Sequence, residues 1–211
     1  MRFVTIINFK TYKQGQKVLQ LAKYIERIDK NIIVGVQATD IKEISSKTHL
    51  QVYSQHVDYF DIGRHTGFIL PEAVKANGAH GTFLNHSEHR LSFDVIKKTV
   101  NRCKKVGLKI AIFAPNLNDA IKIKRLHPDF LIVEPPELVS GKISVSSAKP
   151  DLIKKISSKL KTKFLVGAGI HSSKDVKLAL ELGSSGIAVS SAITTSNNPY
   201  LKLKDLLRLD N

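Results

Sequence analysis

Residues 79–107 carry the pattern that decides the fold, and they read AHGTFLNHSEHRLSFDVIKKTVNRCKKVG. The segment from Ala79 to Leu84 is short and apolar, which is typical of a buried strand. The segment from Ser92 to Val106 has the apolar spacing of a long helix, and Gly107 stands where helices commonly end. A strand, a polar turn and a helix therefore follow one another and predict one βα unit.

The same succession of an apolar run and a helical segment extends along the whole chain. The other predicted strands lie at 3–7, 32–36, 51–55, 108–113, 130–133, 163–166 and 186–189. The second, third and fifth helical segments are short, and the last is predicted from Pro199 to Leu209. Strict βα alternation predicts parallel strands with right-handed crossovers. Eight repeats in 211 residues favour a single-domain (β/α)8 barrel with shortened helices over residues 1–211. A doubly wound open sheet is the alternative, because the strand count fits both architectures.

Composition and charge limit the classes of protein to consider. With 42% hydrophobic residues the chain can bury one sizeable core. Its net charge of +15 attracts anions, either nucleic acid or phosphorylated metabolites. The single cysteine, Cys103, excludes an internal disulfide and a multi-cysteine metal site, and it fits a reducing compartment. No apolar stretch reaches the roughly 20 residues needed to span a bilayer, and the first residues already read as a strand rather than a leader. We expect a soluble cytoplasmic protein with no metal.

Polar side chains gather where the predicted strands end, and chemistry collects at the carboxyl ends of the strands in such barrels. The polar residues at these ends are Asn8, Lys10, Gln55, Asn85, His86, Ser87, Glu88 and Glu134. The last two strands end instead in small residues, Gly167-Ala168-Gly169 and Ser190-Ser191, which let a backbone approach an anion closely. The pattern predicts that a lysine, a histidine and a carboxylate meet at one mouth beside an anion site.

Two of these residues have surroundings that would tune their acidity. His86 precedes the long helical segment, and the positive end of a helix dipole would keep its imidazole neutral and able to polarise a carbonyl group. Glu134 stands between Val133 and Pro135, and desolvation there would raise its pKa and make it a usable base. The alternatives are an ordinary helix cap with a solvated histidine, and a glutamate in a simple ion pair. Gly167-Ala168-Gly169 is equally compatible with a tight turn, and it lacks the third glycine of a dinucleotide-binding fingerprint.

These motifs together resemble the triosephosphate isomerase family, specifically its short archaeal type. The resemblance rests on Asn8-Phe9-Lys10, on Asn85-His86-Ser87-Glu88 with Arg90, and on Glu134-Pro135-Pro136-Glu137-Leu138. It extends over essentially the whole chain and includes Gln55, His65-Thr66-Gly67, Gly167-Ala168-Gly169-Ile170 and Ser190-Ser191. It implies cofactor-free interconversion of dihydroxyacetone phosphate and D-glyceraldehyde 3-phosphate, a step of glycolysis and gluconeogenesis.

The resemblance also implies a role for each matching residue. Glu134 would move a proton between C1 and C2 of the triose, neutral His86 would act on the two oxygens, and Lys10 would stabilise the enediolate. Glu88 would be a supporting acid, and Arg90 would be structural. The substrate-binding residues implied are Asn8, Phe9, Lys10, Val139, Ser140, Gly169, Ser190 and Ser191. Thr66 would pack into a neighbouring subunit of a homodimer or homotetramer, and no specific nucleic acid or membrane partner is implied.

The chain departs from the family pattern at three places. Ser190-Ser191 stands for the family's small pair after the last strand, and we expect no effect there because backbone amides do the binding. Ser140-Gly141-Lys142 replaces the usual Gly-Thr-Gly in the segment from Pro135 to Ile143, which is long enough to close over a ligand. Phe113 stands where the family often has cysteine. Two other functions are compatible with parts of the sequence. One is a different phosphate-handling barrel, which leaves Lys10 and His86 unexplained, and the other is a basic nucleic-acid-binding protein. Lysines are scattered over nearly every predicted helix without interleaved aromatics, so we expect at most weak, salt-sensitive binding of nucleic acid.

Overall fold

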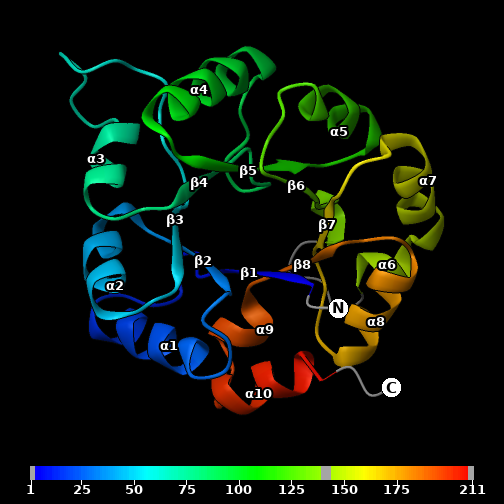
Figure 1. The fold of residues 1–211 in the computed structure, drawn as a ribbon. Helices are drawn as coiled ribbons and strands as arrows, with labels where there is room; N and C mark the ends of the chain where they lie inside the picture. The colour runs from blue at the N-terminus through cyan, green and yellow to red at the C-terminus, as the bar shows by residue number, and fades with distance from the viewer. Residues whose placement is uncertain (1–2, 139–143, 209–211) are drawn as a thin grey trace.

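The structure is a closed barrel of eight parallel strands (Figure 1). It is a computed structural model that describes residues 3–138 and 144–208. The strands are β1 (Val4–Asn8), β2 (Ile33–Val36), β3 (Gln51–Ser54), β4 (Gly81–Leu84), β5 (Lys109–Ala114), β6 (Phe130–Val133), β7 (Leu165–Gly167) and β8 (Gly186–Val189). Each strand pairs with its neighbours in chain order, and β1 pairs with β8 to close the sheet. The predicted (β/α)8 barrel is therefore confirmed over the open sheet.

Helices surround the barrel, as Figure 1 shows. The outer ring consists of α1 (Gln16–Glu26), α2 (Ile41–Lys47), α3 (Pro71–Ala76), α4 (Phe93–Val106), α5 (Leu117–Lys124), α7 (Pro150–Leu160), α8 (Ser173–Glu181) and α10 (Pro199–Leu206). Shorter helices lie in the connections: η1 (Ala38–Asp40), η2 (Pro136–Leu138), α6 (Val145–Ala148) and α9 (Ser191–Thr194). The predicted shortness of α2, α3 and α5 is confirmed, since they have 7, 6 and 8 residues against 14 in α4. In the described part of the chain, no helix has the length and apolar character that crossing a membrane requires.

Apolar side chains cover both faces of the strands. One set fills the barrel interior and includes Ile6, Tyr53, Phe83, Phe113, Ile132 and Leu165. The alternate residues, such as Ile7, Val34 and Val52, pack outward against the helices. This double burial explains why the strands read as continuous apolar runs. Glycine in β4 makes room for the interior rings, because a Cβ on Gly81 would lie 2.4 Å from the Tyr53 ring.

The polar turn between β4 and α4 is separate from the helix, because both ends of α4 are clearly marked. The Ser92 side chain accepts a hydrogen bond from the Val95 amide and caps the first turn. Gly107 adopts φ 74° at the other end, a left-handed conformation that glycine tolerates best. The helix thus begins at Phe93, and residues 85–92 form a separate turn between β4 and α4.

Candidate active site

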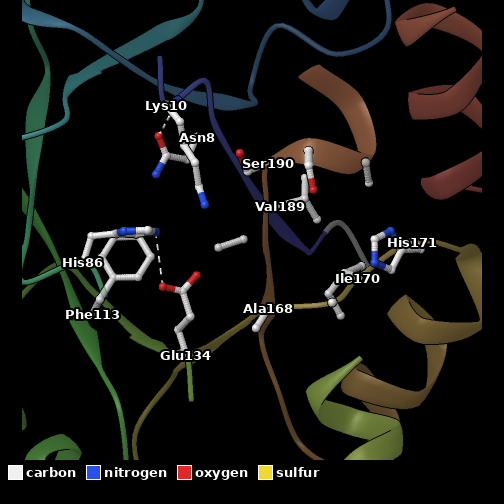
Figure 2. A pocket seen from close by; sticks show the side chains of 14 residues that line it. Asn8, Lys10, His86, Phe113, Glu134, Ala168, Ile170, His171, Val189 and Ser190 are labelled. Atoms are coloured by element: carbon white, nitrogen blue, oxygen red, sulfur yellow. Dashed lines mark hydrogen bonds and ion pairs between the residues drawn. The ribbon is translucent and has the colours of Figure 1, made fainter. Parts of the chain in front are cut away.

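A pocket lies at the carboxyl ends of the strands (Figure 2). Its walls come from six strand ends and comprise Asn8, Lys10, His86, Phe113, Glu134, Ala168, Gly169, Ile170, His171, Ala188, Val189, Ser190, Ser191 and Ala192. Figure 2 shows Lys10, His86 and Glu134 on one side of it, with Ile170 and His171 on the other. The structure therefore brings the ammonium, the imidazole and the carboxylate predicted from the strand ends into one pocket.

Lys10 enters the pocket because the backbone bends sharply after β1. Its φ is +47°, which is unusual for a residue with a side chain. Three hydrogen bonds hold this bend: Lys10 N donates to Asn8 Oδ1 at 2.9 Å, and Gln55 Nε2 donates to Lys10 O at 2.9 Å and to Asn8 Oδ1 at 3.3 Å. Strain of this kind persists only where surrounding contacts enforce it, and it is frequent at functional sites.

Phe9 does not line the pocket, although the resemblance placed it among the substrate-binding residues. Its side chain is 3% exposed and packs in the outer apolar layer between strands and helices. Successive side chains of an extended segment point to opposite faces, so Phe9 points outward after Asn8, whereas Lys10 reaches the mouth through its positive φ. The Phe9 side chain thus has a role in the core, and its expected contact with substrate stays a prediction.

The His86 imidazole is held by a backbone amide and an aromatic ring. The Glu88 amide donates to His86 Nδ1 at 3.2 Å, and the opposite ring nitrogen, Nε2, lies 3.2 Å from Glu134 Oε2. The Phe113 ring packs edge to face against the imidazole at 4.8 Å between centroids. Burial of the ring lowers the pKa of His86 well below its usual range, against the opposing effect of the Glu88 carboxylate. A neutral imidazole that accepts at Nδ1 carries its proton on Nε2, which faces the pocket.

The reason expected for the neutral state of His86 is wrong. The sequence suggested that the dipole of the following helix keeps it neutral, but α4 begins only at Phe93, after the capping residue Ser92. The chain turns instead directly after His86, where the His89 amide donates to the His86 carbonyl at 2.9 Å. A helix dipole acts mainly within the first turn, so burial rather than α4 accounts for the lowered pKa.

Glu134 follows β6 and is almost fully buried, with 8% of its surface exposed. Burial raises the pKa of its carboxyl group to about 7, although the nearby positive charge of Lys10 opposes this shift. Ser87 Oγ lies 3.3 Å from Glu134 Oε2 and donates a hydrogen bond to it. A glycine at the end of β7 leaves space for this group, because a Cβ on Gly167 would lie 3.1 Å from Glu134 Oε1.

Glu88 links the lysine and the histidine from outside the pocket. Its Oε1 accepts from Lys10 Nζ at 2.7 Å, its Oε2 lies 3.6 Å from His86 Nδ1, and its side chain is 55% exposed. The carboxylate thus does not line the main pocket but restrains Lys10 from outside it, whereas the Glu88 backbone amide restrains the His86 imidazole. Arg90 Nη1 donates to the Asn85 carbonyl at 3.0 Å.

The side of the pocket away from Glu134 includes small residues beside Ile170 and His171. Gly169, Ser190 and Ser191 line it, and Ala168 and Gly169 both have positive φ, at 75° and 67°. The Ser190 hydroxyl is buried and has no hydrogen-bond partner among the described contacts. The expected contacts of Val139 and Ser140, and the altered Ser140-Gly141-Lys142, lie outside the described residues.

His171 lines the same pocket and was missed by the sequence reasoning. Its position two residues beyond Gly169, in the loop after β7, was the available signal. Among the residues that the structure describes, no group of three or more His, Cys, Asp or Glu side chains is arranged to hold a metal ion.

Comparison with known proteins covers nearly the whole chain. The family model described as triosephosphate isomerase matches residues 3–207. Curated proteins named triosephosphate isomerase include one from Methanocaldococcus jannaschii, 36% identical over 214 residues, which cover 96% of this chain and 98% of that protein. Others come from Saccharolobus solfataricus, 39% identical with 97% and 94% covered, and from Methanobacterium bryantii, 37% identical with 97% and 95% covered. The pocket described above lies within the matched residues.

Proposed function

The chain belongs to the triosephosphate isomerase family, and we propose that it interconverts dihydroxyacetone phosphate and D-glyceraldehyde 3-phosphate through an enediolate without a cofactor. The observation that carries the proposal is the meeting of Lys10, a neutral His86 and a Glu134 of raised pKa in one pocket. The groups needed to remove, carry and return a proton are thus held together at the strand ends.

Glu134 is the proposed base. Its ionised carboxylate takes a proton from the carbon next to the substrate carbonyl, and the electrons of the C–H bond form the C=C bond of the enediolate. The same carboxyl group then returns the proton to the neighbouring carbon. A base is most effective when its pKa lies near the working pH, and burial brings the pKa of Glu134 to about 7.

His86 and Lys10 act on the oxygens where negative charge develops. The neutral imidazole donates from Nε2 to the carbonyl oxygen and moves protons between the two oxygens. The Lys10 ammonium stabilises the enediolate electrostatically, and Asn8 positions Lys10 by accepting its backbone amide. Glu88 supports both groups, since its carboxylate binds Lys10 and its amide binds His86.

The phosphate group is proposed to bind at the opposite side of the pocket. The backbone amides of Gly169, Ser190 and Ser191 are available there, next to residues too small to obstruct an anion. Val139 and Ser140 belong to the proposed phosphate site on the strength of the family resemblance alone. Anion binding at this side orients the three-carbon chain toward Glu134.

We also propose that the chain forms a homodimer or homotetramer. The loop from 56 to 68, which contains Thr66, exposes Ile62 at 78% and Phe68 at 51%. A cavity of about 390 Å³ lies beside the active site and is lined in part by Lys10, Gln55 and Glu88. The loop of one copy is proposed to fill this cavity of another and so to cover the outer side of Lys10. Analytical ultracentrifugation of the wild type and of Ile62→Asp tests this, and a monomeric wild type at micromolar concentration contradicts it.

The proposed reaction is a step of glycolysis and gluconeogenesis in the cytoplasm. The net charge of +15 is proposed to speed the capture of an anionic substrate rather than to bind nucleic acid specifically. Nucleic-acid binding that stays tight at high salt contradicts this part of the proposal.

A coupled assay in both directions tests the activity. We expect turnover of the two triose phosphates and none of the larger sugar phosphates in a substrate panel. Turnover of another phosphorylated substrate, without isomerisation of the triose phosphates, overturns the proposal and favours a different phosphate-handling barrel.

A further inference from the structure

Asn85 connects the end of β5 to the turn that follows β4. Its Nδ2 donates to the Phe113 carbonyl at 2.8 Å, and its Oδ1 accepts from the Leu91 amide at 3.0 Å. Its side chain is buried, with the residue 6% exposed, and its φ is +61°. Asparagine is among the few residues with a side chain that adopt this conformation readily. Asn85 thus accommodates the positive φ of the backbone, and its side chain links the two segments by hydrogen bonds.

Both segments that Asn85 joins touch the His86 imidazole. The Phe113 ring meets it edge to face with an interplanar angle of 75°, and Figure 2 shows the two rings in contact at the pocket wall. Phe113 is in turn packed edge to face against Phe83 at 5.6 Å. From the other segment, the Glu88 amide donates to His86 Nδ1. The imidazole is therefore restrained on one side by a buried ring and on the other by the turn.

An imidazole needs such restraints because rotation about its Cβ–Cγ bond has only broad, shallow preferences. Rotation of the ring moves Nε2 away from the pocket and breaks the bond from the Glu88 amide to Nδ1. Loss of that bond also removes the reason for the proton to reside on Nε2.

We propose that Asn85 and Phe113 are positioning residues that together hold the plane and the tautomer of the His86 imidazole, with Nε2–H directed into the pocket. The inference rests on the proposed function for its catalytic consequence, but the orientation of the ring is a property of the resting protein. It also gives a reason for phenylalanine at the position where the family often has cysteine.

Two substitutions separate this role from general stability. Asn85→Gly keeps a residue that tolerates positive φ and removes both side-chain hydrogen bonds. Phe113→Leu keeps a buried apolar group and removes the ring. The matched controls are Asn198→Gly, which removes another asparagine that accepts a backbone amide, and Phe164→Leu, which removes another buried ring outside the barrel interior.

The kinetic test compares kcat with the inhibition constant of inorganic phosphate, which on the proposed function should occupy only the anion side of the pocket. We expect kcat to fall about 10- to 100-fold in Asn85→Gly and in Phe113→Leu, as misplacement of a reacting group typically does. The inhibition constant of phosphate should stay within about twofold of the wild-type value. In the two control variants, kcat and this inhibition constant should both stay within the same limit. In the double variant Asn85→Gly/Phe113→Leu, the fall in kcat should be smaller than the product of the two single falls, because both residues act on one ring. Unchanged kcat, or a parallel loss of phosphate inhibition, overturns the inference.

A second measurement does not depend on turnover. In ¹⁵N NMR of the resting protein above neutral pH, we expect the wild-type His86 signals, assigned by their loss in His86→Gln, to show a proton on Nε2. Asn85→Gly and Phe113→Leu should show a mixture of tautomers, and the controls should not. If Asn85→Gly does not fold, Asn85→Asp serves instead, because it retains the acceptor for Leu91 and loses the donor to Phe113. A wild-type tautomer ratio in these variants overturns the inference even if the wild type proves inactive on triose phosphates, which would count against the proposed function alone.

Discussion

The two ends of the barrel use side chains in opposite ways. At the amino end of the strands, where the outer helices finish, the side chain of one helix donates to a carbonyl near the end of the next. These links join Ser45 to Asn77 O at 2.8 Å, Lys75 to Gly107 O at 3.0 Å, Lys104 to Leu126 O at 2.7 Å, and Lys124 to Leu160 O. At the carboxyl end, Lys10, Asn85 and Ala168 adopt positive φ, and His86 and Glu134 are buried.

The comparison indicates that side chains at the amino end stabilise the folded state, whereas those at the carboxyl end destabilise it. Exposed lysines that meet the last carbonyls of a helix satisfy unpaired acceptors and interact well with the negative end of its dipole. The buried titratable groups His86 and Glu134, which lie at the carboxyl end, raise the energy of the folded state. Left-handed backbone at residues with side chains also raises it, but it occurs at both ends, since His127 and Lys161 adopt positive φ after outer helices. Substitutions at the carboxyl end should therefore cost activity more than stability, and those at the amino end should do the reverse.

The largest expected effect is on turnover at the carboxyl end. Glu134→Gln should lower kcat by at least about 10²- to 10⁴-fold, because the amide cannot accept the proton. The variant should still bind a phosphorylated mimic of the enediolate, since the groups that hold the anion remain. The coupled assay and a binding titration measure the two quantities. Glu137→Gln is the control, because Glu137 is 55% exposed and pairs with Lys149. Wild-type turnover in Glu134→Gln rules out the assignment of the base.

The pH dependence is the next largest effect. Because the pKa of Glu134 is raised to about 7, kcat/KM should increase as the pH rises through that value, and below it should fall about tenfold per unit. The phosphate of the substrate also titrates, with a pKa of about 6. Inhibition by inorganic phosphate over the same range separates its contribution. A profile that is already flat above the ordinary pKa of a glutamate excludes the buried base.

The same carboxylate should lower stability at high pH. Between pH 4.5, the ordinary pKa of a glutamate, and about pH 7, the folded state holds the proton of Glu134 whereas the unfolded chain has released it, so stability decreases as the pH rises through this window. Glu134→Gln should therefore be more stable than the wild type at pH 8, by about 2–3 kcal/mol, and the gain should shrink toward pH 5. Urea unfolding at the two values measures the difference. If the stability gain of Glu134→Gln is equal at pH 5 and at pH 8, ionisation of Glu134 is not the cause of the gain.

The smallest expected effect lies at the amino end. Lys104→Met should reduce the free energy of unfolding by about 0.5–1 kcal/mol, because it removes the bond to the Leu126 carbonyl. Lys105→Met is the matched control, since it makes the same change of charge in the same last turn of α4. Neither variant should alter kcat. Equal stability losses in the two variants indicate that charge, not the bond between helices, is responsible.

Several of these features were predictable because they depend on short stretches of chain. The apolar runs identified all eight strands, and polar residues at their ends identified Lys10, His86 and Glu134 as neighbours. The core position of the Phe9 side chain was not predicted, because a motif match ignores the face to which a side chain points. His171 was missed because it lies four residues beyond the end of β7, in a loop whose course the sequence does not show.

The sequence by itself determined the order, number and parallel direction of the strands. A strand that is buried on both faces is a continuous apolar run, which can be recognised from a few neighbouring residues. It also determined which chemical groups stand at the strand ends. Only the tertiary structure decided their acidity and orientation. The pKa of Glu134 and that of His86 depend on how much water their neighbours exclude, and Phe113, Gly167 and the turn after β4 come together only when the barrel closes.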